Sequence, residues 1–429
     1  MTNMTRTIRI ILCAIMVVSL SMPAEPSEPV KNVSLNEFLT LALSGNNMLI
    51  GEAKSLEAAR YSTQASLGGQ RTSLGAAIGG SYLSGQEQAG IRESDISGMD
   101  AGLVLTQPID ISGKFGLEER GAVLAYEMRR ANLDNIINEL MASAEESYWS
   151  AVLANENAAL QRDILTQRVE NLRVTEEKFK HDLVPKLDVI RADSLVAAAE
   201  TLVSEAETER QNILASMALL VGDKDVAPEE TSMAPPQFEP GSDLEEDAER
   251  RPDVRSGRLA LQMADNAKKM AAKGMAPTLD ATVNWVLYSQ PSASSSPQMG
   301  EIVTSLRLNI PILDTSSKYE KLNAKMLEEA AGASLQHTLD TARMELTVAR
   351  NNWHRAVALE RGKRNEAERS NEELRITELM YKEGMGAQID LINAQTENQR
   401  VRTEHLGAVK GMHSAIVQLR RAAGGYIPK

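Results

Sequence analysis

Apolar residues recur at intervals of three and four over long stretches of the chain, which is the spacing of an amphipathic helix. The clearest stripe runs through Leu133, Ile137, Leu140, Ala144, Tyr148 and Val152. It belongs to a predicted helix of about 68 residues at 113–180, and a second of similar length is predicted at 315–383. Helices of this length rise roughly 100 Å and must bury their stripes against neighbouring helices.

Shorter helices are predicted before and after each long one. Their ranges are 35–66 and 243–275, then from the turn at Pro185 to Val221, and from the turn at Gly384 and Gly386 to about Ala423. The two short helices of each half together contain about as many residues as the long helix. The sequence therefore predicts a packed helical tube in which each long helix lies beside two short ones.

One-by-one alternation of apolar and polar residues replaces the helical spacing at four places, two in each half of the chain. These predicted strands are 74–82, 101–109, 279–287 and 302–312. Segments of about ten residues with one apolar face are typical of outer-membrane barrels, but a half-buried soluble sheet shows the same alternation. The polar loops between the strands, and the export signal described below, favour the membrane.

The alternation also assigns the two faces of the last two strands. Lipid-facing residues are predicted to be Leu279, Val283, Trp285, Leu306 and Leu308. The other face carries Asp280, Asn284, Arg307 and Asn309, which either line a barrel lumen or are tolerated on a wet face. Four strands cannot close a barrel, and open sheet edges do not persist in lipid. Because eight strands leave no lumen and twelve do, the natural assembly is a homotrimer.

A phrase near the end of the chain repeats one from its first half. YKEGMGAQIDLINAQ at 381–395 matches FKHDLVPKLDVIRAD at 179–193, which lies 202 residues earlier. LTQPIDIS at 105–112 likewise matches LNIPILDT at 308–315, which lies 203 residues later. Landmarks matched at a nearly constant offset predict a tandem duplication. The predicted parts are repeats at 25–221 and 243–424, a Pro- and acid-rich linker at 222–242, and a C-terminal tail at 425–429.

The first residues have the pattern of an export signal. Arg6 and Arg9 precede the apolar run IILCAIMVVSLSM, which is too short to span a bilayer comfortably. Cleavage is predicted near Ala24, so residues 1–24 form a signal peptide. The only cysteine, Cys13, lies inside the apolar run, and neither a lipid anchor nor a disulfide is predicted for the mature chain.

Composition excludes several classes of function. The net charge of -13 argues against a nucleic-acid partner, because phosphate contacts need clustered lysine and arginine. Aromatic residues make up only 3% of the chain, which is low for one compact globular core. No polar cluster has catalytic spacing, and the histidines and methionines are scattered. The sequence therefore predicts no enzyme, no cofactor and no metal site.

Taken in order, these landmarks resemble the TolC-like outer-membrane efflux proteins over essentially the whole mature chain. The resemblance rests on TQPIDISGK, LNIPILD, RRPDVRSGRLAL and YKEGMGAQIDLINAQ. It implies a homotrimer with a twelve-stranded barrel in the outer membrane and a long α-helical barrel in the periplasm. Such a passive duct joins a periplasmic adaptor and an inner-membrane RND or ABC transporter, and it exports drugs, metals or proteins. A periplasmic coiled-coil scaffold without a channel is the alternative.

The resemblance also assigns roles to the repeated phrase, which corresponds to the helix–turn–helix at the periplasmic tip. Asp390 matches the first acidic gate position, and Asn393 stands where the best-known members have aspartate. The basic turn residue that helps to hold their gate shut corresponds to Gly386 and is missing. The adaptor is expected to touch Leu183, Val184, Pro185, Gly384, Met385 and Gly386. Asp188 is a further gate candidate, although a carboxylate in a first helical turn, as both Asp188 and Asp390 are, also has a capping role.

Overall fold

The computed structural model describes residues 31–83, 96–222, 225–238, 244–290 and 296–426. The predicted signal peptide with Cys13, and parts of the predicted linker and tail, lie outside these residues. The helices are α2 (Leu35–Gly45), α3 (Asn47–Gly68), α4 (Lys114–Lys180), α5 (Lys186–Leu220), α6 (Leu244–Arg250), α7 (Pro252–Ala272), α8 (Thr315–Lys382) and α9 (Gln388–Ala422). The strands are β1 (Lys31–Val33), β2 (Ser73–Leu83), β3 (Ile96–Ile109), β4 (Val226–Pro228), β5 (Thr278–Gln290) and β6 (Glu301–Asn309).

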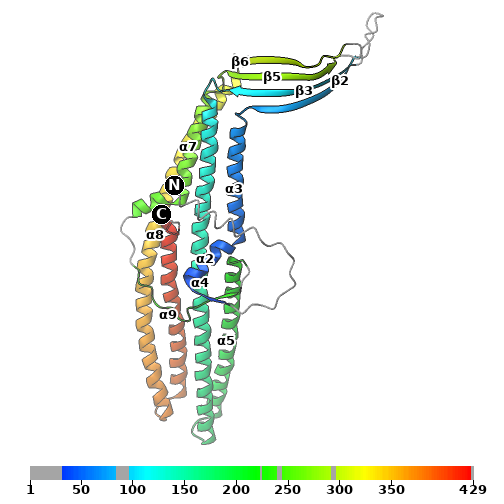
Figure 1. The fold of residues 1–429 in the computed structure, drawn as a ribbon. Coiled ribbons are helices and arrows are strands. Elements are labelled where there is room, and N and C mark those ends of the chain that lie inside the picture. The colour runs from blue at the N-terminus through cyan, green and yellow to red at the C-terminus, as the bar shows by residue number, and fades with distance from the viewer. Residues whose placement is uncertain (1–30, 84–95, 223–224, 239–243, 291–295, 427–429) are drawn as a thin grey trace, which may run out of the picture. The chain divides into compact units, whose positions relative to one another are not determined.

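These elements form two units, and each of the long helices α4 and α8 contributes to both (Figure 1). The first unit comprises residues 1–53, 133–252 and 339–429, and the second comprises 54–132 and 253–338. The predicted long helices are confirmed to within a residue or two at each end, at 67 and 68 residues. No helix in the described ranges combines the length and apolar character that a bilayer crossing requires.

In the first unit the helices lie side by side in the order α5, α4, α9, α8 (Figure 1). The ion pairs that join neighbours are Arg162–Glu207, Asp163–Arg402 at 3.0 Å and Lys363–Glu404 at 2.6 Å. The layer therefore has two edge helices, α5 and α8, each with one side turned away from the other three.

The apolar core of the first unit gathers around the N-terminal strand. Tyr148 from the predicted stripe is fully buried, packs 5.8 Å from the ring of Phe38, and donates a hydrogen bond to the Val33 carbonyl at 3.1 Å. β1 pairs in parallel with β4, and Met233, just beyond β4, is buried in the same core with Val409. Each large apolar side chain buried here contributes about 1.5–3 kcal/mol.

The predicted helix at 35–66 is wrong in one respect, because the structure breaks it at Asn46 into α2 and α3. The Asn46 side chain accepts from the Leu49 amide at 3.2 Å, which caps α3, and donates to the Leu220 carbonyl at 3.3 Å. The break lets Gly45 approach the end of α5 so closely that an added Cβ would lie 2.3 Å from the Val221 carbonyl oxygen.

The predicted helix at 243–275 is likewise broken, at Arg251 between α6 and α7. Pro252 begins α7, and because proline has no amide hydrogen it starts a new helix more readily than it continues one. Arg251 donates to the Ala422 carbonyl at 3.3 Å and forms an ion pair with Glu345 at 2.7 Å. Each half of the chain thus has a helix break that contacts the end of its last helix.

The segment that follows β4 crosses the first unit as a strap, which we define as residues 229–238. The Met233 amide donates to Glu156 at 2.9 Å, and the Ala234 carbonyl lies 2.9 Å from Nε2 of His413. Phe238 packs edge-on against Trp353 with 5.5 Å between ring centroids. The strap therefore contacts α4, α9 and α8 in succession.

His413 is expected to make the strap sensitive to acid. Its ring stacks on Trp149 at 3.7 Å, and burial lowers the pKa of His413. As pH falls through the ordinary histidine range, the unfolded chain takes up a proton that the folded chain resists, so stability is full at high pH and decreases toward low pH.

Thermal unfolding followed between about pH 8 and 5 measures this effect. His413→Gln, which keeps a donor for the Ala234 carbonyl, should flatten the pH dependence, whereas the exposed His337→Gln should leave it unchanged. The charged groups around His413 are Glu145 and Glu146 on α4 and Arg420 and Lys410 on α9. If the unmodified protein and both variants lose stability equally as the pH falls, these groups and not His413 cause the pH dependence.

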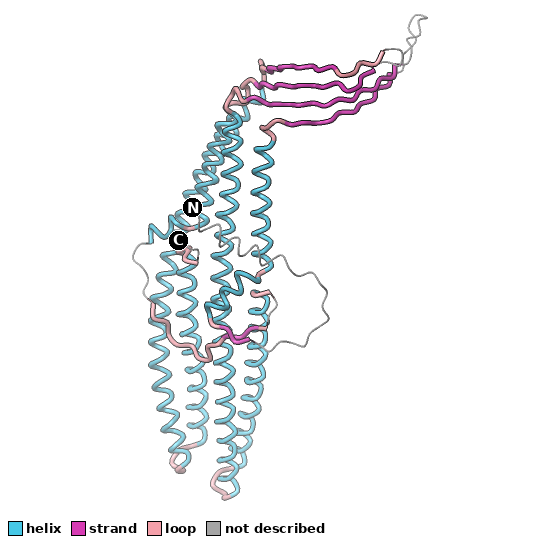
Figure 2. The backbone as a smooth tube through the Cα atoms, in the orientation of Figure 1, coloured by secondary structure: helices cyan, strands magenta, loops and turns pink. Residues whose placement is uncertain are grey.

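The second unit holds an antiparallel four-stranded sheet in the order β2-β3-β5-β6 (Figure 2). Within the described residues, β2 and β6 each have one edge without a partner strand. β3 begins five residues before the predicted strand, at Ile96, and β6 ends three residues before the predicted limit, at Asn309. Pro311 follows, and proline cannot donate to a strand ladder.

The strand register shows which of the predicted residues lie on the same face of the sheet. Leu279 lies opposite Leu308 and Ala281 opposite Leu306, while Asp280 lies opposite Arg307. All five predicted lipid-facing residues therefore share one face, and the four predicted lumen residues share the other, because side chains alternate along a strand. That the apolar face contacts lipid and that the polar face lines a lumen both stay predictions.

A bulge in β5 changes the place of one aromatic residue. Ala101 pairs with Tyr288 and Gly102 with Val286, which leaves Leu287 as the extra residue. Beyond the bulge the alternation is shifted by one, so Tyr288 joins Trp285 on the apolar face. Strict alternation from Trp285 would have put Tyr288 on the opposite face.

The helices of the second unit lie in the order α3, α4, α7, α8. The contacts between neighbours are Thr63 to the Ala122 carbonyl at 3.2 Å, Asn266 to the Leu117 carbonyl at 2.8 Å, and Lys268–Glu328 at 2.5 Å. A small core of Leu124, Ala131 and Leu259 lies between α4 and α7. Like the first unit, this unit is an open layer.

Candidate functional site at the hairpin turns

Two sharp turns reverse the chain at the ends of the long helices. After α4 the backbone turns at Asp182, with φ of 57°, and the Lys178 carbonyl accepts from the Leu183 amide at 2.9 Å. After α8 it turns at Gly384, with φ of 74°, and the Met380 carbonyl accepts from the Met385 amide at 2.8 Å. A residue in the left-handed conformation followed by such bonds is a common helix ending.

The structure brings all six predicted adaptor-contacting residues into these turns. Leu183 and Met385 are 71% and 69% exposed, so each turn presents a large apolar side chain to its surroundings. Pro185 and Ala387 precede the next helices in extended conformation, and neither supplies a side-chain cap. The exposed apolar residues make the turns suited to contact with another protein.

The three predicted gate residues are placed on two helices. Asp390 and Asn393 are both exposed and lie about one turn apart on α9. Asp188 lies in the first turn of α5, is mostly covered, and has Arg191 at 3.7 Å. The structure therefore places Asp390 and Asn393 together on α9 and Asp188 on α5.

A contact that sequence reasoning missed joins the two hairpins just above the turns. Tyr381 on α8 is 3% exposed, and its hydroxyl lies 3.1 Å from that of Thr175 on α4. Nζ of Lys178 lies 3.9 Å from the centre of the Tyr381 ring and also donates to the Tyr381 carbonyl. Burial lowers the pKa of Lys178. We call these three residues the tyrosine lock.

Two further contacts connect α4 and α5 with α9. Gln388 is buried and donates to the Asp188 carbonyl at 2.8 Å. Arg168 is 4% exposed, and its guanidinium donates to Gln395 at 2.6 Å and to Thr396 at 3.3 Å. Burial lowers the pKa of Arg168. Each of these hydrogen bonds to neutral groups contributes about 0.5–3 kcal/mol to stability. Contacts of this strength can break and form again without unfolding of the protein.

A signal for this contact was present in the sequence. Arg168, Asn171 and Thr175 follow one another at helical spacing, and all three are buried polar residues. Polar groups such as these need hydrogen-bond partners when they are buried. The partners on α8 and α9 are about two hundred residues away in sequence, so only the fold identifies them.

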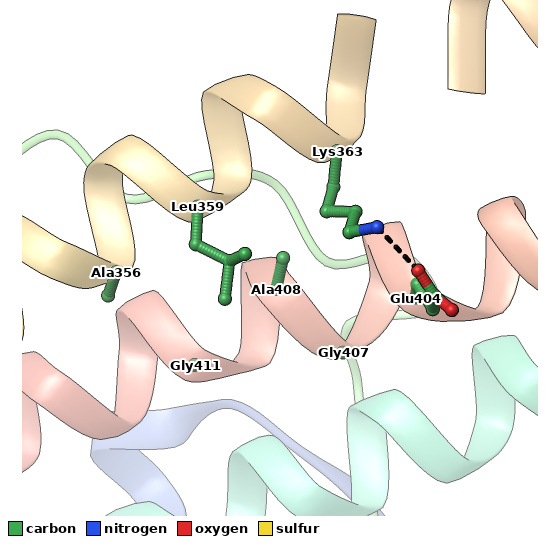
Figure 3. A pocket seen from close by; sticks show the side chains of 7 residues that line it. All are labelled: Ala356, Leu359, Lys363, Glu404, Gly407, Ala408 and Gly411. Atoms are coloured by element: carbon green, nitrogen blue, oxygen red, sulfur yellow. Dashed lines mark hydrogen bonds and ion pairs between the residues drawn. The ribbon is translucent and has the colours of Figure 1, made fainter. Parts of the chain in front are cut away.

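A pocket of about 330 Å³ lies between α8 and α9 in the first unit (Figure 3). Ala356 and Leu359 of α8 face Gly407, Ala408 and Gly411 of α9, and the Lys363–Glu404 ion pair closes one end. Added Cβ atoms on Gly407 and Gly411 would meet nothing within 4 Å. The walls are apolar and the two charges are paired with each other, so the pocket has no catalytic constellation.

A four-stranded sheet with an apolar face, joined to helices of 67 and 68 residues, defines a class of elongated proteins built from helical and strand layers. The outer membrane efflux protein family model matches residues 39–223 and 244–425. The chain therefore belongs to the outer membrane efflux protein family. Membership places it in the outer membrane, gives it a role in transport and not in catalysis, and favours the channel over the scaffold.

Relatives cover nearly the whole chain. Outer membrane protein OprJ of Pseudomonas aeruginosa is 24% identical over 416 residues, which are 92% of this chain and 84% of OprJ. The structure of the outer-membrane channel OprN matches with a TM-score of 0.80 at 20% identity over 94% of both chains. The open state of the Neisseria gonorrhoeae MtrE outer membrane channel matches with a TM-score of 0.78 at 20% identity, over 95% and 98% of the two chains. The predicted fold class, mainly α with a small β-sheet part, is confirmed.

Proposed function

We propose that the protein is a passive homotrimeric exit duct of a tripartite efflux pump or type I secretion system, with a gate at its hairpin turns. The observation that carries this proposal is the open four-stranded sheet, which has one mostly apolar face and, within the described residues, two edges without a partner strand. Unpaired strand edges cannot persist in lipid, so the sheet needs further copies to close. Three copies would supply twelve strands, enough for a lumen.

The edge helices of the first unit support closure by further copies. α5 exposes Leu187 and Ile190, and α8 exposes Ile376 and Leu379. A free layer would leave these apolar side chains in water, whereas a ring of layers would bury α8 of one copy against α5 of the next. The predicted repeats at 25–221 and 243–424 would then give six similar hairpins around one opening.

The gate would combine the tyrosine lock with the exposed carboxylates of Asp390. In a trimer Asp390 would form a ring of three charges, and Asn393 would add a neutral ring about one turn away. Because Gly386 offers no basic side chain, the tyrosine lock would be the contact that keeps each hairpin pair closed. A periplasmic adaptor would bind Leu183, Met385 and their neighbours, and an RND or ABC transporter in the inner membrane would supply the energy.

Electron microscopy of the protein extracted from outer membranes in detergent, combined with conductance in planar bilayers, tests the duct. Threefold particles that conduct ions would support it. Particles without threefold symmetry, or trimers that never conduct even after the tyrosine lock is removed, would contradict it. The predicted signal peptide is checked separately, by N-terminal sequencing of the mature protein.

The apolar face of the sheet gives a further expected result. Leu306→Arg should sharply reduce the amount of assembled protein in the outer membrane, because arginine on the lipid face costs about 2–4 kcal/mol near the bilayer midplane. Ser305→Arg, the adjacent position on the other face, is the matched control and should assemble nearly normally. Heat-modified gel mobility of membrane extracts measures assembly, and equal losses in both variants would reject the assignment of the faces.

A further inference from the structure

The sheet and the helices of the second unit meet at one end of the sheet. Ser73, at the start of β2, pairs with Thr106 near the end of β3. Thr278, at the start of β5, likewise pairs with Asn309 at the end of β6. α4 and α8 start just after this end of the sheet, and α3 and α7 finish just before it (Figure 2). Because the proposed function assigns the apolar face to lipid, one boundary between lipid hydrocarbon and lipid headgroups falls at this level.

The two connections from strand to helix expose apolar side chains at this level. Ile312 and Leu313, between β6 and α8, are 91% and 88% exposed, and Ile111, between β3 and α4, is exposed as well. Tyr319, in the first turns of α8, is also exposed. Exposed apolar residues next to an aromatic residue with a polar tip are typical of the boundary between hydrocarbon and headgroups.

Four cations surround these connections. Arg71 lies between α3 and β2, Lys114 begins α4, and Lys318 and Lys321 lie in the first two turns of α8. Lys114 is partly exposed and the other three are exposed. In the part of the chain that the structure describes, none of the four forms an ion pair. We call them the basic collar, and their lack of acidic partners contrasts with the net charge of -13 of the whole chain.

The acidic groups beside the basic collar bind to other parts of the protein. Asp110 accepts from two backbone amides at the start of α4, at 3.1 and 3.0 Å. Asp314 accepts from the Ser316 amide at 2.9 Å, and Glu320 lies 3.4 Å from the Ser316 hydroxyl. Glu118 accepts from an amide side chain in the connection after α3 at 3.0 Å. The cations of the collar are therefore left for an anion from outside the chain.

Resting on the assignment of the apolar face to lipid in the proposed function, we propose that the basic collar binds the phosphate groups of anionic phospholipids. Ammonium and guanidinium groups form charge-assisted hydrogen bonds with phosphate oxygens. Long basic side chains can lie along the exposed apolar residues while their charged ends reach the headgroups. A zwitterionic phospholipid carries its own cation beside the phosphate, so the collar favours phospholipids with net negative charge.

The internal duplication repeats the central part of the collar. Lys318 lies 204 residues after Lys114, and Asp314 lies 204 residues after Asp110. Each half of the chain therefore starts its long helix with an aspartate that accepts from backbone amides and a lysine four residues later. In the proposed trimer, six such lysines would surround the structure at the level of the headgroups.

Thermal unfolding of the detergent-solubilised full chain, with phosphatidylglycerol or phosphatidylcholine titrated in separately, tests the collar. Phosphatidylglycerol should reach half of its full stabilising effect at the lower concentration. Lys114→Gln with Lys318→Gln should reduce this preference about tenfold or more, because each lysine near an anionic surface contributes about 1 kcal/mol. Lys114→Arg with Lys318→Arg keeps both charges and should keep the preference.

The matched control uses the other ends of the same two helices. Lys180 and Lys382 are exposed near the ends of α4 and α8, and Lys180→Gln with Lys382→Gln should leave the preference unchanged. An equal loss in this control would overturn the collar, because the preference would then follow net charge alone. A preference that survives Lys114→Gln with Lys318→Gln, or that is absent from the unmodified protein, would overturn it as well.

Two further readouts separate the collar from a free-anion site and from the duct. Water-soluble glycerol phosphate should not shift the unfolding temperature, and a shift equal to that of phosphatidylglycerol would show a site for free phosphate and refute the lipid surface. Particle symmetry and conductance of the same samples judge the duct. Threefold, conducting particles without lipid preference would defeat the collar alone, whereas particles that prefer phosphatidylglycerol but lack threefold symmetry would support the collar and defeat the duct.

Discussion

Removing the tyrosine lock is expected to open the channel without unfolding it. The double variant Tyr381→Phe with Lys178→Gln keeps an aromatic ring in its buried place but removes the hydroxyl bonded to Thr175 and the cation over the ring. A lost buried hydrogen bond costs about 1–3 kcal/mol, and a lost cation–π contact costs about 0.5–2 kcal/mol. Because about 1.4 kcal/mol is a tenfold change, open probability should rise at least tenfold.

Single-channel recording in planar bilayers measures this change, and influx of a large antibiotic into intact cells reports it in the outer membrane. Lys180→Gln with Tyr319→Phe is the matched control, since both side chains are exposed and outside the lock. Equal closed times in the lock variant and the control would show that other contacts, such as that of Gln388 with the Asp188 carbonyl, hold the hairpins together.

Gly222→Ala is expected to cause the largest loss of stability of any alanine substitution at the helix ends. Gly222 has φ of +82°, where a residue with a Cβ costs about 1–2 kcal/mol. The new Cβ would also lie 2.5 Å from the Gly45 carbonyl oxygen. This contact is between backbone segments, which cannot shift as easily as a flexible side chain. Together these effects should lower the free energy of unfolding by about 3 kcal/mol or more.

Two glycines elsewhere provide graded controls for Gly222→Ala. Gly424→Ala shares the positive φ, at +66°, but the closest atom is the Cδ of Pro252 at 3.3 Å, so its loss should be smaller. Gly411→Ala lies in α9 with nothing within 4 Å and should stabilise the helix by up to about 1 kcal/mol. Thermal unfolding in detergent ranks the three, and any other order would contradict the close approach of Gly45 and Gly222.

Helical periodicity located the long helices well, because the spacing of apolar side chains within each helix is enough to define it. α4 and α8 begin and end within a residue or two of the predicted limits, since their stripes persist and the turns at Asp182 and Gly384 end them locally. The break at Arg251 had a local signal in Pro252 that the periodicity did not reveal, whereas the break at Asn46 also depends on the end of α5, which is remote in sequence. Similarly, only the bulge at Leu287 tells which face Tyr288 occupies.

The candidate site was predictable in place but not in its contacts. The repeated phrase located both turns and all six predicted turn residues, four of which are exposed, because local sequence determines where these turns occur. The tyrosine lock escaped because Thr175 and Tyr381 are 206 residues apart and each is unremarkable alone. A resemblance could point to Gly386 as a missing basic residue, but it could not show that Lys178 from another helix reaches the same region.

The parallel pairing of β1 with β4 has a consequence for how the chain folds. Lys31 pairs with Val226, and the core beneath this pair also needs Val409 from α9, close to the other end of the chain. Contacts of such high sequence separation form late, because the entropy of closing a long loop must be overcome first. β1 and β4 are therefore expected to pair only after the last helix has become available, so a chain that ends before Val409 should leave this core unformed.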